Sequence, residues 1–271
     1  MKRIIVPTDF SSGAWNALVY AMDLAQTLNV NQLLVLNSYY EPHSGAATML
    51  SIHELMKKES EQDLELLRKK IEEKGYEQLL DIQYKSVHAS LVGALNSQLK
   101  ESGQLIVMGT IGETGALEKL IGSNASLVIS NVNCPVLVIP PDGRFSFTGK
   151  LLLAGDTENL PERIDTDVLK AFCGYHTSSL LEVVQVVDNG ELFDQKAFES
   201  LLEGIQYECH PLAGENVAQV LDDYVANQPI DILVLLKVKR SLLDKLFHKS
   251  ITKKLVLHAK IPILVLKDSE A

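Results

Sequence analysis

The sequence predicts an α/β protein built from two tandem, five-stranded, mostly parallel open sheets flanked by helices. Three observations lead to this prediction. Short apolar segments alternate with helix-like segments along the whole chain, as in parallel sheets with helical crossovers. The layout of the first segment recurs after a turn-rich stretch near residue 140. Finally, 271 residues fit two domains of ordinary size.

The strands of the first half are predicted from apolar runs. Leu33 to Leu36 is continuously apolar, which is typical of a parallel strand buried on both faces. Ile82 and Tyr84 alternate with polar residues, which indicates a half-exposed strand. The expected strands are 2–7, 33–36, 82–87, 105–108 and 135–139.

The helices are predicted from caps and from apolar residues at helical spacing. Ser11 or Ser12 supplies an N-cap for the first helix. A long charged helix runs from about Ile52 to Lys74 and stops at Gly75, a common residue just after a helix end. The last two helices of this half are expected from Leu91 to a stop at Gly103, and over 123–132.

The second half is a trimmed repeat of the first. Pro140-Pro141-Asp142-Gly143 is a turn-rich boundary, which predicts domains 1–143 and 144–271. Aligning Asp9 with Asp156 places Leu33-Leu34 on Leu180-Leu181. Aligning Pro135 with Pro262 instead places residues 105–108 on 232–235, and the two alignments differ by about twenty residues. We expect most of the missing residues to correspond to the loop and long helix at 40–74.

Composition excludes several classes of protein. The 25 basic and 35 acidic side chains give a formal net charge of −10, which argues against a general nucleic-acid binder. The three cysteines share no CxxC spacing, which excludes a disulfide scaffold and a cysteine-based zinc site and fits a reducing, cytoplasmic location. The amino terminus resembles neither a signal peptide nor an anchor, and no run of 18 apolar residues predicts a membrane span.

One segment departs from the acidic balance. Residues 237–260 contain eight Lys and Arg side chains and one acid, Asp244. This segment could dock an acidic protein partner or a phosphorylated ligand, or it could be a solvated helix face balanced by acids elsewhere.

A glycine-rich loop carries the most specific local pattern. Gly109-Thr110-Ile111-Gly112 is followed, after nine residues, by Gly122-Ser123-Asn124. The loop joins a buried strand to a helix, where glycines let backbone amides approach an anion and the helix N-terminus favours phosphate. It has neither the Walker pattern nor the Gly-x-Gly-x-x-Gly fingerprint. The alternative is a strand-to-helix turn that has lost affinity for a nucleotide.

Together with Pro7-Thr8-Asp9 and Cys134-Pro-Val-Leu-Val-Ile, this motif resembles the universal stress protein family in its ATP-binding branch. The resemblance implies strand order 3-2-1-4-5 in each half, with ATP or AMP bound across the strand ends and Mg²⁺ able to accompany the phosphates. It implies that Asp9 contacts the ribose or adenine side, although Asp9 could instead only cap the following helix. It also implies that the Ser38 backbone lies against adenine. The full expected set of nucleotide-binding residues is Pro7, Thr8, Asp9, Ser38, Met108, Gly109, Thr110, Gly112, Gly122, Ser123 and Asn124.

The resemblance also implies pairing between the two halves. Members of the family usually dimerise through the fifth strand, so Pro135–Ile139 is expected to pair with Pro262–Leu266 in an intrachain pseudo-dimer. Further pairing of two chains as a homodimer stays open.

The second half has lost the glycines of the motif, so we expect one nucleotide per chain, bound in the first half. The loss removes the conformational freedom of glycine and puts side chains where phosphates would lie. The aligned pairs are Gly109 and Leu236, Gly112 and Lys239, Gly122 and Lys249, and Ser123 and Ser250.

The function expected from these patterns is adenine-nucleotide binding in a stress-response or signalling protein that regulates a protein partner. No residues form a hydrolase motif or supply an evident general base, so no catalytic residue is expected. The seven histidines lack a metal-ligand spacing; His88, which follows the third strand, is expected to be a structural loop residue. The alternatives are a slow Mg²⁺-dependent ATPase and a scaffold that acts without nucleotide.

Overall fold

The computed structural model describes residues 1–40, 46–100, 102–110, 122–155, 160, 164–187, 195–214, 216–237 and 261–267. The strands of the first half are β1 (Arg3–Pro7), β2 (Gln32–Tyr39), β3 (Asp81–His88), β4 (Gln104–Gly109) and β5 (Val136–Ile139). Those of the second half are β6 (Lys150–Ala154), β7 (Leu180–Val187), β8 (Tyr207–Ala213), β9 (Ile232–Lys237) and β10 (Ile263–Lys267). The helices are α1 (Ser12–Thr27), α2 (Ala46–Glu72), η1 (Tyr76–Gln78), α3 (Leu91–Gln98), α4 (Ser123–Asn131), α5 (Thr166–Cys173), α6 (Lys196–Glu199) and α7 (Val217–Asn227).

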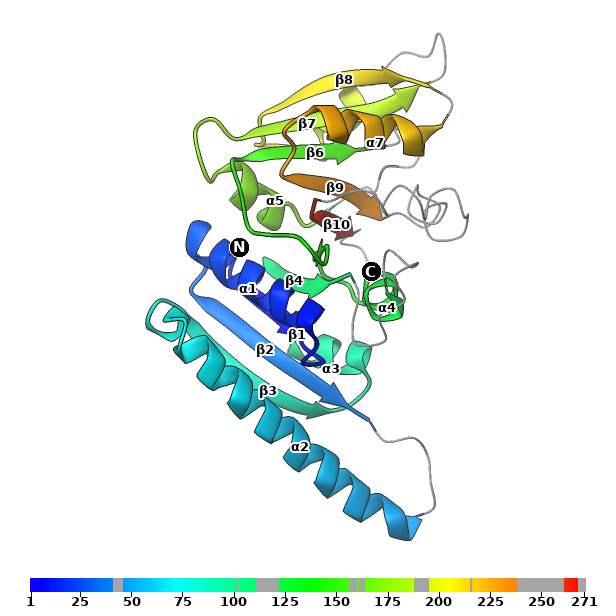
Figure 1. Ribbon diagram of the computed structural model, residues 1–271. Helices are drawn as coiled ribbons and strands as arrows, with labels where there is room; N and C mark the ends of the chain where they lie inside the picture. Colours follow the sequence, from blue (N-terminus) through cyan, green and yellow to red (C-terminus); the bar gives the residue numbers. More distant parts are fainter. Residues whose placement is uncertain are drawn as a thin grey trace.

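All ten described strands form one continuous sheet, in the order β3-β2-β1-β4-β5-β10-β9-β6-β7-β8 (Figure 1). The predicted order 3-2-1-4-5 is confirmed in each half. The predicted pairing of the fifth strands is also confirmed, because β5 and β10 run antiparallel with Leu137 opposite Leu264. The two predicted sheets are therefore joined edge to edge, and the carboxyl ends of the parallel strands lie on opposite edges in the two halves.

The predicted repeat alignment is wrong by one residue at the second strand. Pro7 pairs with Leu36 in the first half, and its counterpart Ala154 pairs with Val184 in the second. The counterpart of Leu33 is therefore Leu181, one residue later than the sequence alignment gives. A shift of one residue moves a side chain to the other face of a sheet. The counterpart of Leu36 is therefore Val184 and not Val183.

The elements otherwise lie close to their predicted positions, with two exceptions at helix ends. Helix α3 ends at Gln98, five residues before its predicted stop at Gly103. The long helix α2 begins at Ala46, six residues earlier than its predicted start near Ile52. In the second half, residues 188–206 take the place of residues 40–80, and α6 is the helix described there. This agrees with the predicted loss at the long helix. The domain boundary after residue 143 stays a prediction.

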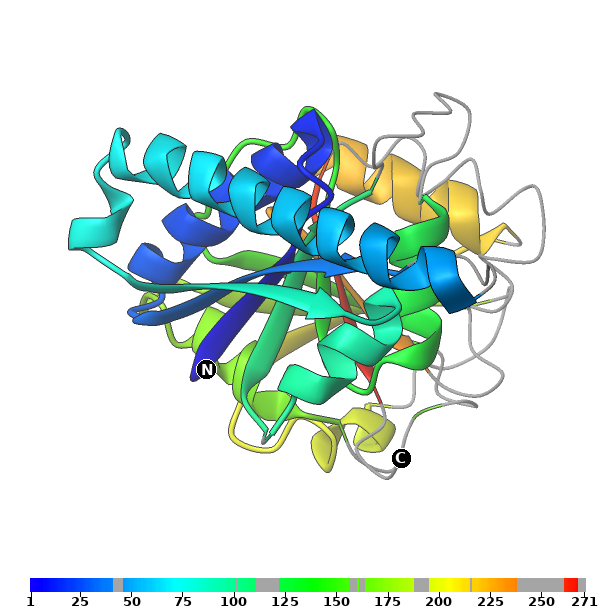
Figure 2. The same cartoon turned by 90° about the horizontal axis from the view of Figure 1, so that it is seen from below.

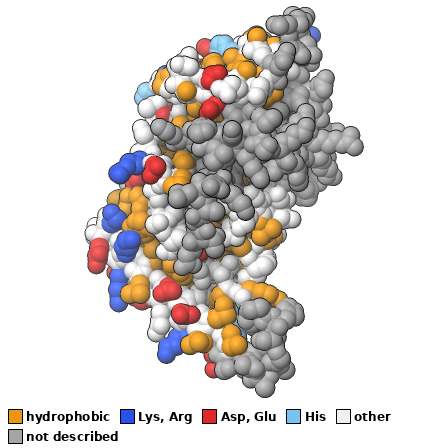
Figure 3. Space-filling view, turned by 45° about the vertical axis from the view of Figure 1, so that its right-hand side comes forward, with side chains coloured by type: hydrophobic (Ala, Val, Ile, Leu, Met, Phe, Trp, Pro, Cys, Tyr) orange, Lys and Arg blue, Asp and Glu red, His pale blue; other side chains and the backbone are white. Residues whose placement is uncertain are grey.

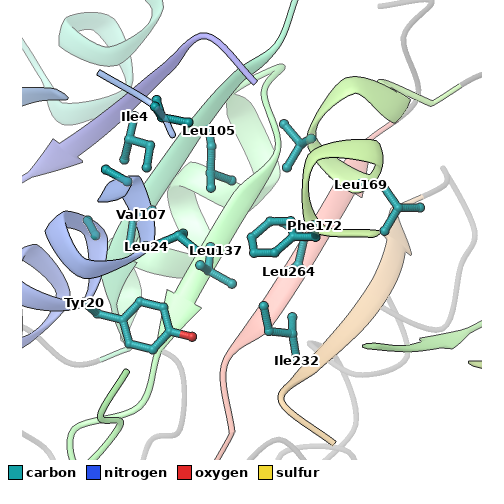
Figure 4. Packing of buried hydrophobic residues seen from close by; sticks show 14 of the residues in the cluster. Ile4, Tyr20, Leu24, Leu105, Val107, Leu137, Leu169, Phe172, Ile232 and Leu264 are labelled. Carbon is teal, nitrogen blue, oxygen red and sulfur yellow. The ribbon is translucent and has the colours of Figure 1, made fainter. Parts of the chain in front are cut away.

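Helices cover both faces of the sheet and bury two hydrophobic clusters. One cluster packs α1, α2 and α5 against one face, and the other packs α3, α4 and α7 against the opposite face. Figure 2 shows α1 and α2 on one side of the first-half strands and α3 on the other. Core side chains from both halves meet across the seam, where Phe172 lies near Leu137 and Leu264 (Figure 4). The seam is therefore part of the hydrophobic core.

Candidate functional site

The carboxyl ends of β1, β2 and β4 form a stepped edge in the first half. Strand β1 ends at Pro7, whereas its neighbour β2 continues for three residues to Tyr39. On the other side β4 ends at Gly109, opposite Ile139 of β5. In open parallel sheets, ligands bind at this edge, beside the strand where the order of connections reverses. Here that strand is β1, so the predicted site residues lie where a ligand would be expected.

A tight turn follows β1 and holds the predicted residue Asp9. The Thr8 side-chain Oγ1 accepts a hydrogen bond from the Phe10 amide at 3.0 Å, and Asp9 Oδ1 accepts one from the Ser11 amide at 3.1 Å. Phe10 has a φ of 62°, a left-handed conformation that is uncommon for a bulky residue. Asp9 is therefore a structural acceptor in the turn before α1, but the N-cap of α1 is Ser11, whose hydroxyl accepts from the Ala14 amide. A role of Asp9 toward a ligand stays a prediction.

The backbone of Ser38 faces the space beyond the end of β1. The Thr8 amide donates to the Leu36 carbonyl at 2.8 Å, so the backbone polar groups of Leu36 point toward β1. Polar backbone groups two residues apart in a strand point the same way, which directs those of Ser38 toward the same side. Tyr39 agrees with this alternation, since its carbonyl accepts from the Ala89 amide on the β3 side. The predicted backbone contact of Ser38 therefore has the required direction.

The two described ends of the glycine-rich loop lie together. The Thr110 amide donates to the Ile139 carbonyl at 2.9 Å, and the Gly122 amide donates to the Thr110 carbonyl. The start of α4 is thereby held beside the end of β4, which contains Met108 and Gly109. The predicted residue Gly112 lies outside the described residues.

Two features at this junction leave polar groups for a ligand. The Thr110 side chain is only 8% exposed, and among the described residues no group hydrogen bonds to its Oγ1. Helices α1, α3, α5 and α7 each begin with a side-chain cap, whereas α4 begins at Gly122 without one. Buried polar groups and the first amides of a helix normally have partners. An anion bound at Ser123 and Asn124 would supply acceptors for both.

A buried polar network, which sequence reasoning missed, lies behind the Thr8 turn. Asn37 Nδ2 donates to the Thr8 carbonyl at 2.8 Å, and the Ser60 hydroxyl of α2 donates to Asn37 Oδ1 at 2.7 Å. The Ser60 and Ser86 hydroxyl oxygens are 2.6 Å apart. These residues connect α2 and β3 to the site turn. The available signal was a polar residue, Asn37, directly after the apolar run of β2.

A cluster of four rings lies at the ends of β2 and β3. His88 is the last residue of β3, and its ring centroid lies 4.5 Å from that of His53 on α2. The Tyr39 and Tyr40 rings lie 5.4 and 6.0 Å from His88. His88 was expected to be a loop histidine but ends a strand, and it forms the wall of the same edge together with α2.

The matching position in the second half is filled by an aromatic ring. Gly155 corresponds to Thr8, because its amide donates to Val184 as that of Thr8 does to Leu36. The fully buried ring of Phe198 lies over Gly155, so close that a Cβ there would come within 2.5 Å of its Cζ. Leu236, the counterpart of Gly109, is a buried residue of β9. Asp156 and residues 239–260, including the basic segment beyond Lys237, lie outside the described residues.

The described residues otherwise present ordinary surface chemistry. They contain no group of three His, Cys, Asp or Glu side chains that could hold a metal ion. In that same part of the chain, no helix has both the length and the apolar character needed to cross a membrane. Figure 3 shows acidic and basic side chains interspersed on one face of the molecule. All three cysteines are free thiols.

The chain is similar to proteins of one family. The family model described as the universal stress protein family matches residues 1–140 and 178–267. Universal stress protein MJ0531 of Methanocaldococcus jannaschii is 33% identical over 147 aligned residues, and the match covers 51% of this chain and 81% of that protein. Universal stress protein MJ0577 of the same organism is 29% identical over 153 residues, covering 51% of this chain and 94% of that protein. Both relatives match about half of the chain, as a tandem arrangement requires.

Solved structures with low sequence identity share the fold over nearly the whole chain. A universal stress protein from Archaeoglobus fulgidus has a TM-score of 0.69 at 18% identity, covering 99% of this chain and 97% of that one. The functionally unknown protein PA1789 from Pseudomonas aeruginosa has a TM-score of 0.57 at 13% identity, covering 100% and 94%. The tandem architecture is therefore found in other solved proteins.

Proposed function

The chain belongs to the universal stress protein family, and on that premise we propose that its first half binds one adenine nucleotide, ATP or AMP, in a stress-response or signalling role. The observation that carries this proposal is the buried Thr110 hydroxyl, which has no partner among the described residues. It lies where the end of β4 meets the uncapped start of α4. A phosphate oxygen is an acceptor of the charge and size that suit both groups.

Each part of the site suits a different part of the nucleotide. The Thr110 hydroxyl and the first amides of α4, from Gly122 through Asn124, would donate to phosphate oxygens. Asp9, whose Oδ1 accepts from the Ser11 amide, would also accept from the ribose or adenine side through its carboxylate. The backbone groups of Ser38 would meet the adenine edge. If Mg²⁺ accompanies the phosphates, it neutralises part of their charge.

Nucleotide binding would act by changing the affinity for a protein partner. For this, the nucleotide must bind two conformations of the protein with different affinity. The Thr8 turn is connected through Asn37 to Ser60 of α2, which gives the ligand a direct contact route to that long helix. The free thiols suit a reducing compartment, and we place the protein in the cytoplasm.

The decisive variant is Thr110→Val, which keeps the shape of the side chain and removes its hydroxyl. We expect nucleotide affinity to fall about tenfold, because one charge-assisted hydrogen bond is lost. The nucleotide-free protein should gain up to about 1 kcal/mol of stability, because a buried group without a described partner has been removed. Calorimetric titration and urea unfolding measure the two effects, which have opposite signs.

Thr148→Val is the matched control. The Thr148 hydroxyl donates to Asp231 at 2.9 Å beside the start of β6, which three strands separate from β4, so nucleotide affinity should not change. Unchanged affinity in Thr110→Val would contradict the assignment of phosphate to this junction. Titration should also give one nucleotide per chain; two equivalent sites would contradict loss of the second site.

The identity of the nucleotide and its fate need a separate measurement. The protein should be purified without added nucleotide and denatured, and the small molecules released should be identified by mass. ATP that persists at one per chain during incubation with Mg²⁺ supports binding without hydrolysis. Steady production of ADP would favour the slow ATPase instead.

A further inference from the structure

A lysine from the second half holds the far end of the candidate phosphate-binding helix. Lys267 is the last residue of β10, and its side chain is only 8% exposed. Its ammonium Nζ donates to the Val128 carbonyl at 3.3 Å and also to the Val132 carbonyl. These are carbonyls of the C-terminal end of α4, whose N-terminus carries the proposed phosphate site.

The antiparallel seam brings Lys267 to this helix. Alternate residues of β10, Ile263 and Val265, pack in the same cluster as Val128 and Ile129 of α4. Lys267 continues that alternation and so points to the face that α4 covers. Its charge also acts on Cys134, which lies between α4 and β5: burial raises the pKa of the Cys134 thiol to about 12, and the nearby Lys267 opposes that shift.

Helix α4 lacks a positive group of its own at this end. Its last turn contains no basic residue, and Asn131 Nδ2 donates to the Leu127 carbonyl at 2.9 Å. The last carbonyls of a helix carry partial negative charge and are stabilised by a cation. Lys267, from the second half, therefore supplies the positive charge that the nine-residue helix α4 lacks at its C-terminal end.

We propose that Lys267 is a positioning residue for the nucleotide site of the other half: by holding the C-terminal carbonyls of α4, it fixes the direction in which the amides at Gly122 to Asn124 point. This role rests on the proposed nucleotide function. The second half has lost the glycine motif, but through Lys267 it would support the site that lies in the first half.

The test compares Lys267→Met with Lys267→Arg by titration with ATP and with adenosine. ATP affinity should fall about fivefold in Lys267→Met, because the amides that donate to phosphate are less well fixed. Adenosine affinity should not change, because adenosine has no phosphate. Lys267→Arg should recover most of the ATP affinity, since the charge is kept and a cavity of about 480 Å³ beside Lys267 gives room for the larger group.

Hydrogen exchange of the nucleotide-free protein provides a second readout. The amides of α4 should exchange faster in Lys267→Met than in the wild type, whereas those of α3 should not. Lys100→Met is the matched control. Lys100 lines the same cavity, but the lysine that donates to the α4 carbonyls is Lys267. It should leave ATP affinity and α4 exchange unchanged.

The outcomes separate this role from the proposed function. Equal loss of ATP and adenosine affinity in Lys267→Met, or no loss at all while the wild type binds ATP, would overturn the positioning role alone. A wild-type protein that binds neither ATP nor AMP would overturn the proposed function, and the positioning role with it.

Discussion

The two halves have the same strand order but differ in what covers the end of the first strand. In the first half, Asn37 and Ser60 form a buried polar network against the Thr8 carbonyl. In the second half, the ring of Phe198 lies directly over Gly155, the counterpart of Thr8. A polar network at a strand end keeps the site turn in a fixed place beside an open edge. A ring at the same point makes the end of the strand part of the hydrophobic core.

If the first half binds the nucleotide as proposed, this difference explains how one fold can keep a site in one copy and lose it in the other. The polar network connects the turn to α2, the helix that the second half has largely lost. Without that helix, the face of the sheet near Gly155 needs another cover, and Phe198 on the short segment around α6 provides it. The second half therefore differs from the first in three related ways: it lacks the long helix, it lacks the glycines of the motif, and it has a ring over the end of its first strand.

The largest expected effect is that of Phe198→Ala. The ring is fully buried, so its removal leaves a cavity that should cost about 3–5 kcal/mol of unfolding free energy. Urea unfolding measures this loss. Calorimetry should still give one nucleotide per chain, because the glycines of the motif remain absent from the second half. A second bound nucleotide would show that the ring alone blocks the second site.

A double-mutant cycle with Gly155→Ala isolates the contact itself. The added Cβ would lie 2.5 Å from Phe198 Cζ, so the single variant should be destabilised by about 1–3 kcal/mol. In Phe198→Ala that crowding is absent, and Gly155→Ala should then cost much less. Additive effects of the two substitutions would contradict the packing of the ring on this glycine.

Asn37→Val should have a smaller effect on stability than Phe198→Ala but a direct one on the site. The variant removes the hydrogen bonds that Asn37 makes with the buried Thr8 carbonyl and the Ser60 hydroxyl. This loss should cost about 2–3 kcal/mol of unfolding free energy. Nucleotide affinity should also fall, because Asp9 follows Thr8 in the turn. Unfolding and titration experiments on the same preparation measure both.

Ser86→Ala is the control for that prediction. It removes only the contact between the Ser60 and Ser86 hydroxyl groups and leaves both bonds of Asn37 in place. We expect a loss of about 1 kcal/mol and unchanged nucleotide affinity. If Asn37→Val alters affinity no more than Ser86→Ala does, then the network has no role beyond stability.

Most of the fold could be predicted from the sequence because its signals are local. Apolar runs such as 33–36 and 105–108 have the length of buried strands, and Gly75 closely follows the end of α2. Gly103 was a weaker signal, because α3 already ends at Gln98. Helix α2 begins earlier than predicted, since the apolar pattern before Ile52 lacks a clear cap. The one-residue error at the second strand arose because Leu180-Leu181 matches Leu33-Leu34 by composition, whereas register depends on contacts between strands.

The site could be predicted only in part, for a different reason. The loop glycines belong to a motif with fixed spacing, and the roles of Asp9 and Ser38 were expected from the family resemblance; all of these roles stay predictions. Asn37, Ser60 and Ser86 come together only through packing, and no sequence spacing marks them. The burial of the Thr110 hydroxyl and the reach of Lys267 across the seam likewise depend on tertiary structure.

The smallest expected effect concerns a matched pair of tyrosines, one in each half. Tyr76 donates to Asp23 at 2.7 Å, and Tyr224 donates to Glu182 at 2.8 Å. Burial, followed by the hydrogen bond and the carboxylate charge, raises the pKa of each phenol to about 12. An unfolded tyrosine has a pKa of about 10. Each phenol thus holds its proton more tightly in the folded protein, and its contribution to stability is complete below about pH 10 and is lost as the pH rises through 12.

The free energy of unfolding should therefore fall between about pH 10 and 12, and Tyr76→Phe and Tyr224→Phe should each make that fall less steep. The two variants should change the slope similarly, because the pKa of both phenols is raised to about 12 and both donate to a carboxylate. Cys134, whose pKa is raised to about 12, adds a part of the slope that neither variant removes. Urea unfolding across this pH range measures the slopes. A slope that changes in only one variant would show that the two halves differ here too, and wild-type slopes in both would contradict the role of these hydrogen bonds.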